Sequence, residues 1–104
     1  MTNEPRQIKM KAIDVVPYLY GIWCTIEGGK PFVNCIVAQR WSEDKPGQII
    51  FMLDSHNFDF RMADEEMEVV QVDDTGYLTT ERMTRYIEEH RAFVAKRPAK
   101  WEDR

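Results

Sequence analysis

The sequence predicts an α+β domain: an antiparallel β-meander of about five strands, open or curled toward a small barrel, with one C-terminal α-helix packed on it. Short runs rich in β-branched and aromatic residues, separated by turn residues, occupy residues 8–72. One stretch with the apolar spacing of a helix follows at residues 80–97. The chain has 104 residues, which is the size of one domain with one core, so residues 1–104 are expected to form a single domain.

Three strands are predicted in the first part of the chain. Pro17 interrupts the first of them, and Gly28-Gly29 separates the second from the third. A Gly-Gly pair suits a two-residue hairpin turn because both residues can adopt positive φ. The predicted strands are residues 8–16, 18–26 and 32–41.

A turn at Gly28-Gly29 also predicts the register of that hairpin. Facing residues then have numbers that sum to 57, which places Cys24 opposite Val33 and Cys35 opposite Ile22. In this register the two thiols are diagonal neighbours on one face. We interpret both as small hydrophobic side chains of the core, because no lysine, histidine or helix N-terminus that could activate a thiol flanks either one in the sequence.

Two or three more strands are predicted before the helix. Residues 48–53 are apolar on both faces, as in a central strand, and residues 54–57 form a polar turn. Residues 58–62 alternate strictly between apolar and charged, which predicts a strand with one face in water. Residues 67–72 suit a further strand, and a short helical turn at 64–67 is the alternative.

The helix has a predicted start, face and end. Thr79 or Thr80 is suited to the N-cap, with Glu81 in the first turn, and Pro98 stops the helix. The residues expected to face the core recur at helical spacing and are Met83, Tyr86, Ile87, His90, Phe93 and Val94.

The net charge of −4 arises from one segment. Residues 54–74 hold eight acidic residues against Arg61 alone, or −7, whereas residues 1–53 carry +1 and residues 75–104 carry +2. The simplest interpretation is a solubilising connector, and the alternative is a surface that docks onto a basic site of another protein. The acidic balance disfavours nucleic-acid binding.

Several functional classes lack their sequence signature. The N-terminus has no basic start followed by an apolar run, and two cysteines are too few for a disulfide-rich module, so we expect a cytoplasmic protein. No run of about 20 apolar residues predicts a membrane span. Phosphate-binding loops and metal-ligand spacings are missing, so no cofactor and no metal are expected.

An enzyme is the less favoured interpretation. Asp54, Ser55 and His56 combine a carboxylate, a hydroxyl and an imidazole, but neighbours in a turn rarely orient as a catalytic triad. His90 lies on the apolar helix stripe, where a histidine at the margin of the core is expected. A catalytic role would gain support if His56 and His90 lay in one cleft with perturbed pKa values.

The apolar surface of the strands exceeds what one helix can cover. The sheet could close on itself, the terminal segments could wrap the second face, or another chain could cover it. In the last case an interface patch is predicted, with Trp23 as its anchor. The patch comprises Leu19, Trp23, Phe32 and Ile36.

These observations predict a non-catalytic protein-binding module. It would self-associate or occupy a site on a partner protein, as an inhibitor or adaptor does; a phage-type protein that blocks a host defence component is one such case. The alternative is a small-ligand protein that binds a nucleotide or metabolite at an oligomer junction. The residues predicted to line that ligand site are Asp54, His56, Asn57 and Arg61.

Overall fold

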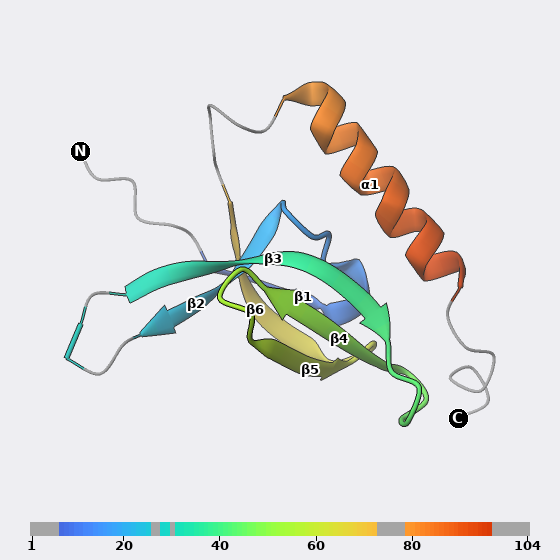
Figure 1. The fold of residues 1–104 in the computed structure, drawn as a ribbon, viewed down its shortest axis with the longest axis horizontal. Helices are drawn as coiled ribbons and strands as arrows, with labels where there is room; N and C mark the ends of the chain where they lie inside the picture. The colour runs from blue at the N-terminus through green and yellow to red at the C-terminus, as the bar shows by residue number, and fades with distance from the viewer. Residues whose placement is uncertain (1–6, 26–27, 30, 73–78, 97–104) are drawn as a thin grey trace.

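The computed structural model describes residues 7–25, 28–29, 31–72 and 79–96 (Figure 1). These ranges contain six strands, one helix and a short 3-10 turn at Ala12–Asp14. The strands are β1 (Gln7–Lys11), β2 (Tyr20–Thr25), β3 (Pro31–Trp41), β4 (Gln48–Leu53), β5 (Phe58–Met62) and β6 (Glu66–Gln71), and the helix is α1 (Thr80–Ala95).

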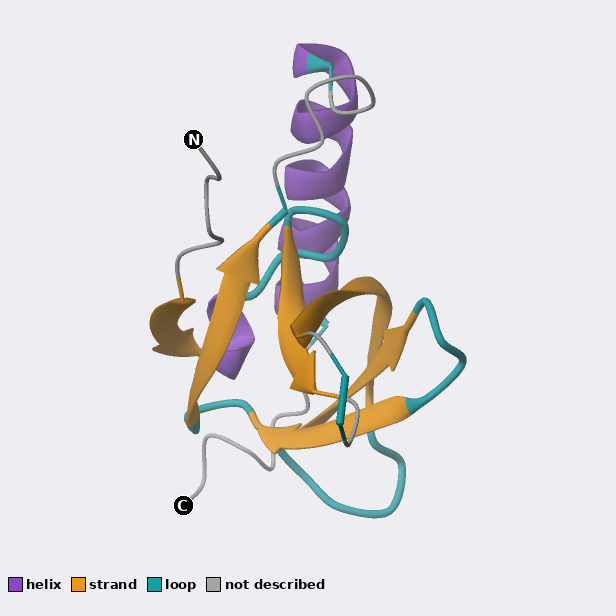
Figure 2. Cartoon of the chain, turned by 90° about the vertical axis from the view of Figure 1, so that its left-hand side faces the viewer, coloured by secondary structure: helices purple, strands orange, loops and turns teal. Residues whose placement is uncertain are grey.

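The strands form one antiparallel sheet in the order β1-β6-β2-β3-β4-β5. Strands β2 to β5 follow the predicted meander, and β6 then returns to lie between β1 and β2. The predicted α+β class and C-terminal helix are therefore confirmed. Figure 2 shows a strongly curved sheet with α1 on one side, and the described strands do not close into a barrel.

The curvature has a local cause in β3. The pairing of β3 with β4 shifts register between Ile36 and Ala38, where a β-bulge bends the strand. The first half of β3 continues the sheet toward β2, and its second half pairs with β4. The bend creates a concave inner face that holds the core.

The core is drawn from both halves of the sheet and from the 3-10 segment. Ile36, Ile49, Phe51 and Val69 are fully buried there. Ala12, Val15, Leu53, Ala63 and Met67 complete the cluster, and Trp41 and Phe93 pack at its margin. One apolar centre thus joins strands that are distant in the sequence.

Helix α1 begins as the sequence predicts. The Thr79 side chain accepts a hydrogen bond from the backbone N–H of Arg82, which caps the first turn. No helix residue is fully buried, and the predicted stripe is half-buried except for Met83, which is 39% exposed. The helix therefore lies against the core with one stripe only. The predicted end at residues 97–98 lies outside the described residues.

The predicted hairpin register is wrong by one residue. Trp23 faces Val33 and Cys24 faces Phe32, so facing numbers sum to 56. A shift of one residue in one strand exchanges its two faces. Cys24 and Cys35 consequently lie on opposite faces of the sheet, and both are free.

Gly21 marks the tightest point of this hairpin. It faces Cys35 on β3 and Val70 on β6. A Cβ atom at this position would lie 2.6 Å from Val33 Cγ1 and 2.8 Å from the Asn34 carbonyl oxygen. Only glycine fits between the two strands without displacing the backbone.

Two other predicted boundaries differ from the structure. The first strand ends at Lys11 and not at residue 16, because Ala12 and Ile13 donate backbone hydrogen bonds to Glu65 and Ala63. After these bonds the chain leaves the strand, and Ala12 and Val15 join the core cluster. The strand predicted at residues 67–72 is confirmed as β6, which begins at Glu66, so the alternative of a helical turn at 64–67 is wrong. Ile26, the predicted end of the second strand, lies outside the described residues.

Candidate functional site

Strands β3, β4 and β5 have two faces, and only one of them packs into the core. On the inner face, Ile49 and Phe51 belong to the core. We call the other side of these strands the outer face. It consists of two cross-strand rows, Ala38–Met52–Phe58 and Arg40–Ile50–Phe60.

The outer face exposes two phenylalanines on β5. Phe58 is 53% exposed and Phe60 is 55% exposed, the highest values among the large hydrophobic residues in the described chain. They flank Ile50, which is 8% exposed, and Met52, which is half-buried. Large apolar side chains grouped on one surface mark a site of interaction more often than single ones do.

The sequence predicts the alternation of β5 but does not predict which face meets water. Strict alternation usually places the apolar residues inward. In this strand the apolar residues face outward, and Asp59 and Arg61 share the side of Phe51 and Ile49. The water-facing side of β5 is therefore its apolar side, which the pattern alone gives no reason to expect.

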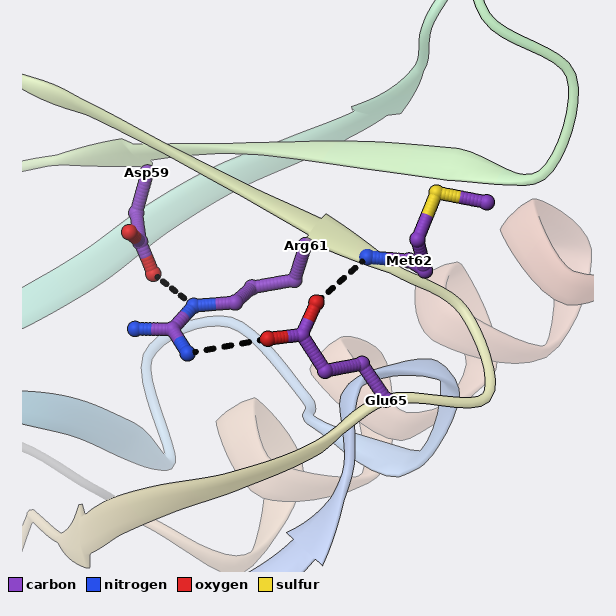
Figure 3. A network of polar contacts seen from close by, with 4 residues as sticks. All are labelled: Asp59, Arg61, Met62 and Glu65. Carbon is purple, nitrogen blue, oxygen red and sulfur yellow. Dashed lines mark hydrogen bonds and ion pairs between the residues drawn. The ribbon is translucent and has the colours of Figure 1, made fainter.

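A network of ion pairs explains how charged residues occupy the inner side of β5 (Figure 3). Arg61 Nε lies 2.9 Å from Asp59 Oδ2, and an Arg61 terminal nitrogen lies 3.3 Å from Glu65 Oε2. The other oxygen of Glu65 accepts a hydrogen bond of 3.1 Å from the backbone N–H of Met62. Burial opposes the charge on Arg61, but Asp59 and then Glu65 outweigh it and raise the pKa of the guanidinium.

The outer face is also hollowed. A shallow groove of about 240 Å³ runs between β3 and β5. Its lining is mainly apolar and is formed by Ala38, Gln39, Arg40, Ile50, Met52 and Phe58. The groove thus lies beside the exposed phenylalanines. Protein-binding surfaces often hold an anchor side chain of the partner in a pocket of this kind.

The predicted interface patch is not one surface. In the observed register Trp23 lies on the face of Val33, whereas Phe32 lies on the opposite face with Cys24. Ile36 is fully buried in the core and is not available to a partner. Leu19 and Trp23 are half-buried, and Phe32 is 39% exposed. The patch was predicted from the wrong register, which explains why its four residues do not share one surface.

The predicted ligand residues fall in two places. Asp54, His56 and Asn57 are exposed in the β4–β5 turn, where His56 has a positive φ of 66°. The turn is held to β3 because Asn34 Nδ2 donates to Ser55 Oγ at 3.0 Å. Arg61 lies four residues farther along β5, roughly 13 Å away at the rise of a strand, and is engaged by Asp59 and Glu65.

A separate pocket, which we call the helix pocket, lies between α1 and β3. It has a volume of about 270 Å³. Two lining rings, Tyr18 and Tyr86, stack with centroids 4.5 Å apart. A third lining ring, Phe93, stacks at 4.7 Å on Trp41, which lies outside the lining. The lining residues are Pro17, Tyr18, Val37, Ala38, Gln39, Tyr86, Glu89, His90 and Phe93.

Tyr18 holds an unusual backbone conformation at this pocket. Its φ is 70°, in the left-handed region that costs a bulky residue about 1–3 kcal/mol. Its N–H donates to the Ile36 carbonyl, and its ring is fixed against Tyr86. Strained conformations of this kind cluster at functional sites, so we treat the pocket as a second candidate site.

His90 is the half-buried histidine of the pocket. Its Nδ1 lies 2.7 Å from Gln39 Oε1, and an amide oxygen only accepts, so Nδ1 donates. Gln39 in turn donates to the Val15 carbonyl at 3.3 Å. Burial lowers the pKa of His90 and outweighs the Ile13 carbonyl and the Asp14 carboxylate, which raise it. His56 is not among the lining residues, so the two histidines do not share this pocket.

The described residues contain no group of three or more histidine, cysteine or acidic side chains placed to hold a metal ion. None of the described helices is long and apolar enough to cross a membrane.

Comparison with protein-family models, curated proteins and solved structures gave no match for this chain. The functional proposals below therefore depend on the geometry of the outer face and of the helix pocket.

Proposed function

We propose that the chain is a non-catalytic protein-binding module that binds through the outer face of β3, β4 and β5. The observation that carries this proposal is the exposure of Phe58 and Phe60, at 53% and 55%, above the apolar row residues Ile50 and Met52. Burying these two side chains against another protein would remove apolar surface from water, at about 25 cal/mol for each Å².

Charge supports the same assignment. Arg40 is the one charged residue in the two rows, although the strand and loops around them belong to the acidic segment of the chain. Protein interfaces commonly have an apolar centre with polar and charged residues at the rim, and arginine is enriched within them. The acidic segment would then act at the rim and favour association with partners of positive potential.

The test compares an outer-face variant with a matched helix variant. Phe58→Ser with Phe60→Ser removes the two exposed rings, and Met83→Ser removes a similarly exposed side chain on α1. Cross-linking in extracts of the source cell, followed by mass spectrometry, identifies whatever covers the outer face. We expect cross-links from the outer face in the wild type and in the Met83→Ser variant but not in the double variant. Equal cross-linking in all three proteins would contradict the proposal.

The second candidate function is binding of a small metabolite in the pocket between α1 and β3. The specific observation is the positive φ of Tyr18 beside the half-buried His90. No lysine or arginine is among the residues that the structure places in the lining, so nothing there pairs with a nucleotide's phosphates. Aromatic faces with Glu89 instead suit a neutral or cationic organic molecule.

Thermal denaturation with a panel of small organic cations and neutral aromatics tests this second function. A ligand of the folded state raises the melting temperature by mass action. The shift should disappear in Tyr86→Leu and persist in Glu88→Gln, a change on the exposed side of α1. A panel that leaves the wild-type melting temperature unchanged would remove this candidate.

A further inference from the structure

Strand β5 ends the sheet, with β4 as its one paired neighbour in the described chain. Asn57 and Ala63 exchange backbone hydrogen bonds with β4 and the turn before it, since Leu53 donates to Asn57 and Ala63 donates to Gly47. In an antiparallel ladder the direction of these groups alternates. Phe58, Phe60 and Met62 therefore direct their backbone N–H and C=O groups away from β4, toward the open edge.

Part of this edge is already occupied. The Met62 N–H donates to Glu65 Oε1 at 3.1 Å (Figure 3). The Glu65 N–H in turn donates to the Met62 carbonyl at 2.9 Å. The edge groups of Phe58 and Phe60 receive no such cap from the described residues. An uncapped edge strand is a template for pairing with another chain.

The sequence of β5 is complementary to itself in charge. Phe58-Asp59-Phe60-Arg61-Met62 reads apolar, acidic, apolar, basic, apolar. An antiparallel copy centred on Phe60 places Asp59 opposite the partner's Arg61, and Arg61 opposite the partner's Asp59. Phe60 then faces the partner's Phe60, and Phe58 faces the partner's Met62. Opposite charges directly across a strand pair stabilise it, and like charges destabilise it.

The competing registers lack this match. The edge groups belong to even-numbered residues, so pairs that share hydrogen bonds must join even to even. Shifting the centre by one residue in either direction gives the two nearest such registers. One places Asp59 opposite the partner's Asp59, and the other places Arg61 opposite the partner's Arg61. Charge therefore selects the register centred on Phe60.

We propose that β5 pairs antiparallel with β5 of a second copy of this chain, about a two-fold axis at Phe60. Pairing occupies the β5 edge and leaves both outer faces uncovered, so it goes beyond the proposed function. Pairing continues the two curved sheets into one, joins the two outer faces, and gives each copy the same contacts, as a closed two-fold dimer requires. The Met62 N–H exchanges Glu65 for the carbonyl of the partner's Phe58.

Two charge reversals test the register. In Asp59→Arg both facing pairs become basic with basic, and in Arg61→Asp both become acidic with acidic. Each variant alone should dimerise at least about tenfold more weakly than the wild type, because two attractive pairs turn repulsive. An equimolar mixture should recover dimerisation as heterodimers, since every facing pair is then opposite in charge. Native mass spectrometry distinguishes heterodimers from homodimers by mass.

The mixture distinguishes charge pairing between two chains from a role of the same charges within one chain. Each variant breaks the ion pair between residues 59 and 61 within its own chain, and mixing does not repair that damage. Recovery upon mixing therefore reports contacts between chains. Association of either variant with itself as tightly as the wild type would overturn the proposal, and so would a mixture without heterodimers while both variants melt cooperatively.

A cysteine substitution gives a second measurement that needs neither reversal to fold. A facing pair that shares hydrogen bonds has Cα atoms about 5.5 Å apart, within the range for a disulfide. Phe60→Cys should oxidise to a covalent dimer faster than Met83→Cys, an exposed position on α1. Equal oxidation rates would count against the pairing.

The two proposals fail in different ways. If Phe58→Ser with Phe60→Ser abolishes cross-linking of the outer face but mixing the reversals yields no heterodimer, the outer face binds another protein and the self-pairing is wrong. If the outer face shows no cross-linking in any variant and the wild type stays monomeric at all concentrations, both proposals are wrong.

Discussion

The inner and outer faces of β3, β4 and β5 carry similar amounts of apolar side chain but differ in what covers them. Ile49 and Phe51 are fully buried under the curved sheet, while Phe58 and Phe60 remain about half exposed. The helix and the 3-10 segment both add to the inner side. The difference separates two sets of hydrophobic residues, one that forms the core and one that stays in contact with water.

Removing one phenylalanine from each face should give the largest difference in stability. Phe51→Ala should lower the free energy of unfolding by about 3–5 kcal/mol, because it leaves a cavity in the core. Phe60→Ala, the same change on the outer face, should alter it by no more than about 0.5 kcal/mol in the monomer. Urea denaturation at low protein concentration measures both. Similar losses would show that the outer face also supports the fold.

A smaller effect is expected where α1 is attached to the inner face. Trp41 Nε1 donates to the Phe93 carbonyl at 3.0 Å, and the two rings stack. Trp41→Phe keeps an aromatic ring and removes this hydrogen bond, which should cost about 0.5–1.5 kcal/mol. Trp23→Phe is the matched control, because the structure describes no hydrogen bond from its indole. Thermal melts of the two variants should therefore differ, and equal melting temperatures would contradict the role of Trp41.

The smallest expected effect is a pH dependence at the helix pocket. Burial lowers the pKa of His90 in the folded chain below its unfolded value of 6.5. The unfolded state therefore binds a proton first as the pH falls, so stability is full above about 6.5 and declines below it, levelling off beneath the folded pKa. His90→Gln should reduce this decline between pH 7 and 5. An unchanged slope in urea titrations at those pH values would assign the decline to other groups.

The sequence was most informative about elements and least informative about their pairing. The strands from Gln48 to Met62 and the cap at Thr79 follow from local composition and turn chemistry, and each occurs as predicted. The register around Gly28-Gly29 was predicted from turn type and is off by one residue. That single residue decided the predicted interface, because it separates Trp23 from Phe32.

The candidate sites were predictable to different degrees. The alternation of β5 was visible, but its orientation depends on Asp59, Arg61 and Glu65 satisfying one another on the inner side. The helix pocket joins Tyr18, Gln39 and His90 from three distant segments, and the sequence offered only the placement of His90 on the apolar stripe. Such contacts arise from packing and have no local signal.

The sequence by itself predicted the α+β class, the order of the elements along the chain, and an excess of apolar strand surface over what one helix could cover. The tertiary structure decided where that excess lies. The bulge between Ile36 and Ala38 bends β3, so Ile49 and Phe51 of β4 close into the core, while Phe58 and Phe60 on the outer face of β5 stay about half exposed. Periodicity fixes which residues share a face, whereas curvature and long-range pairing fix which face is buried.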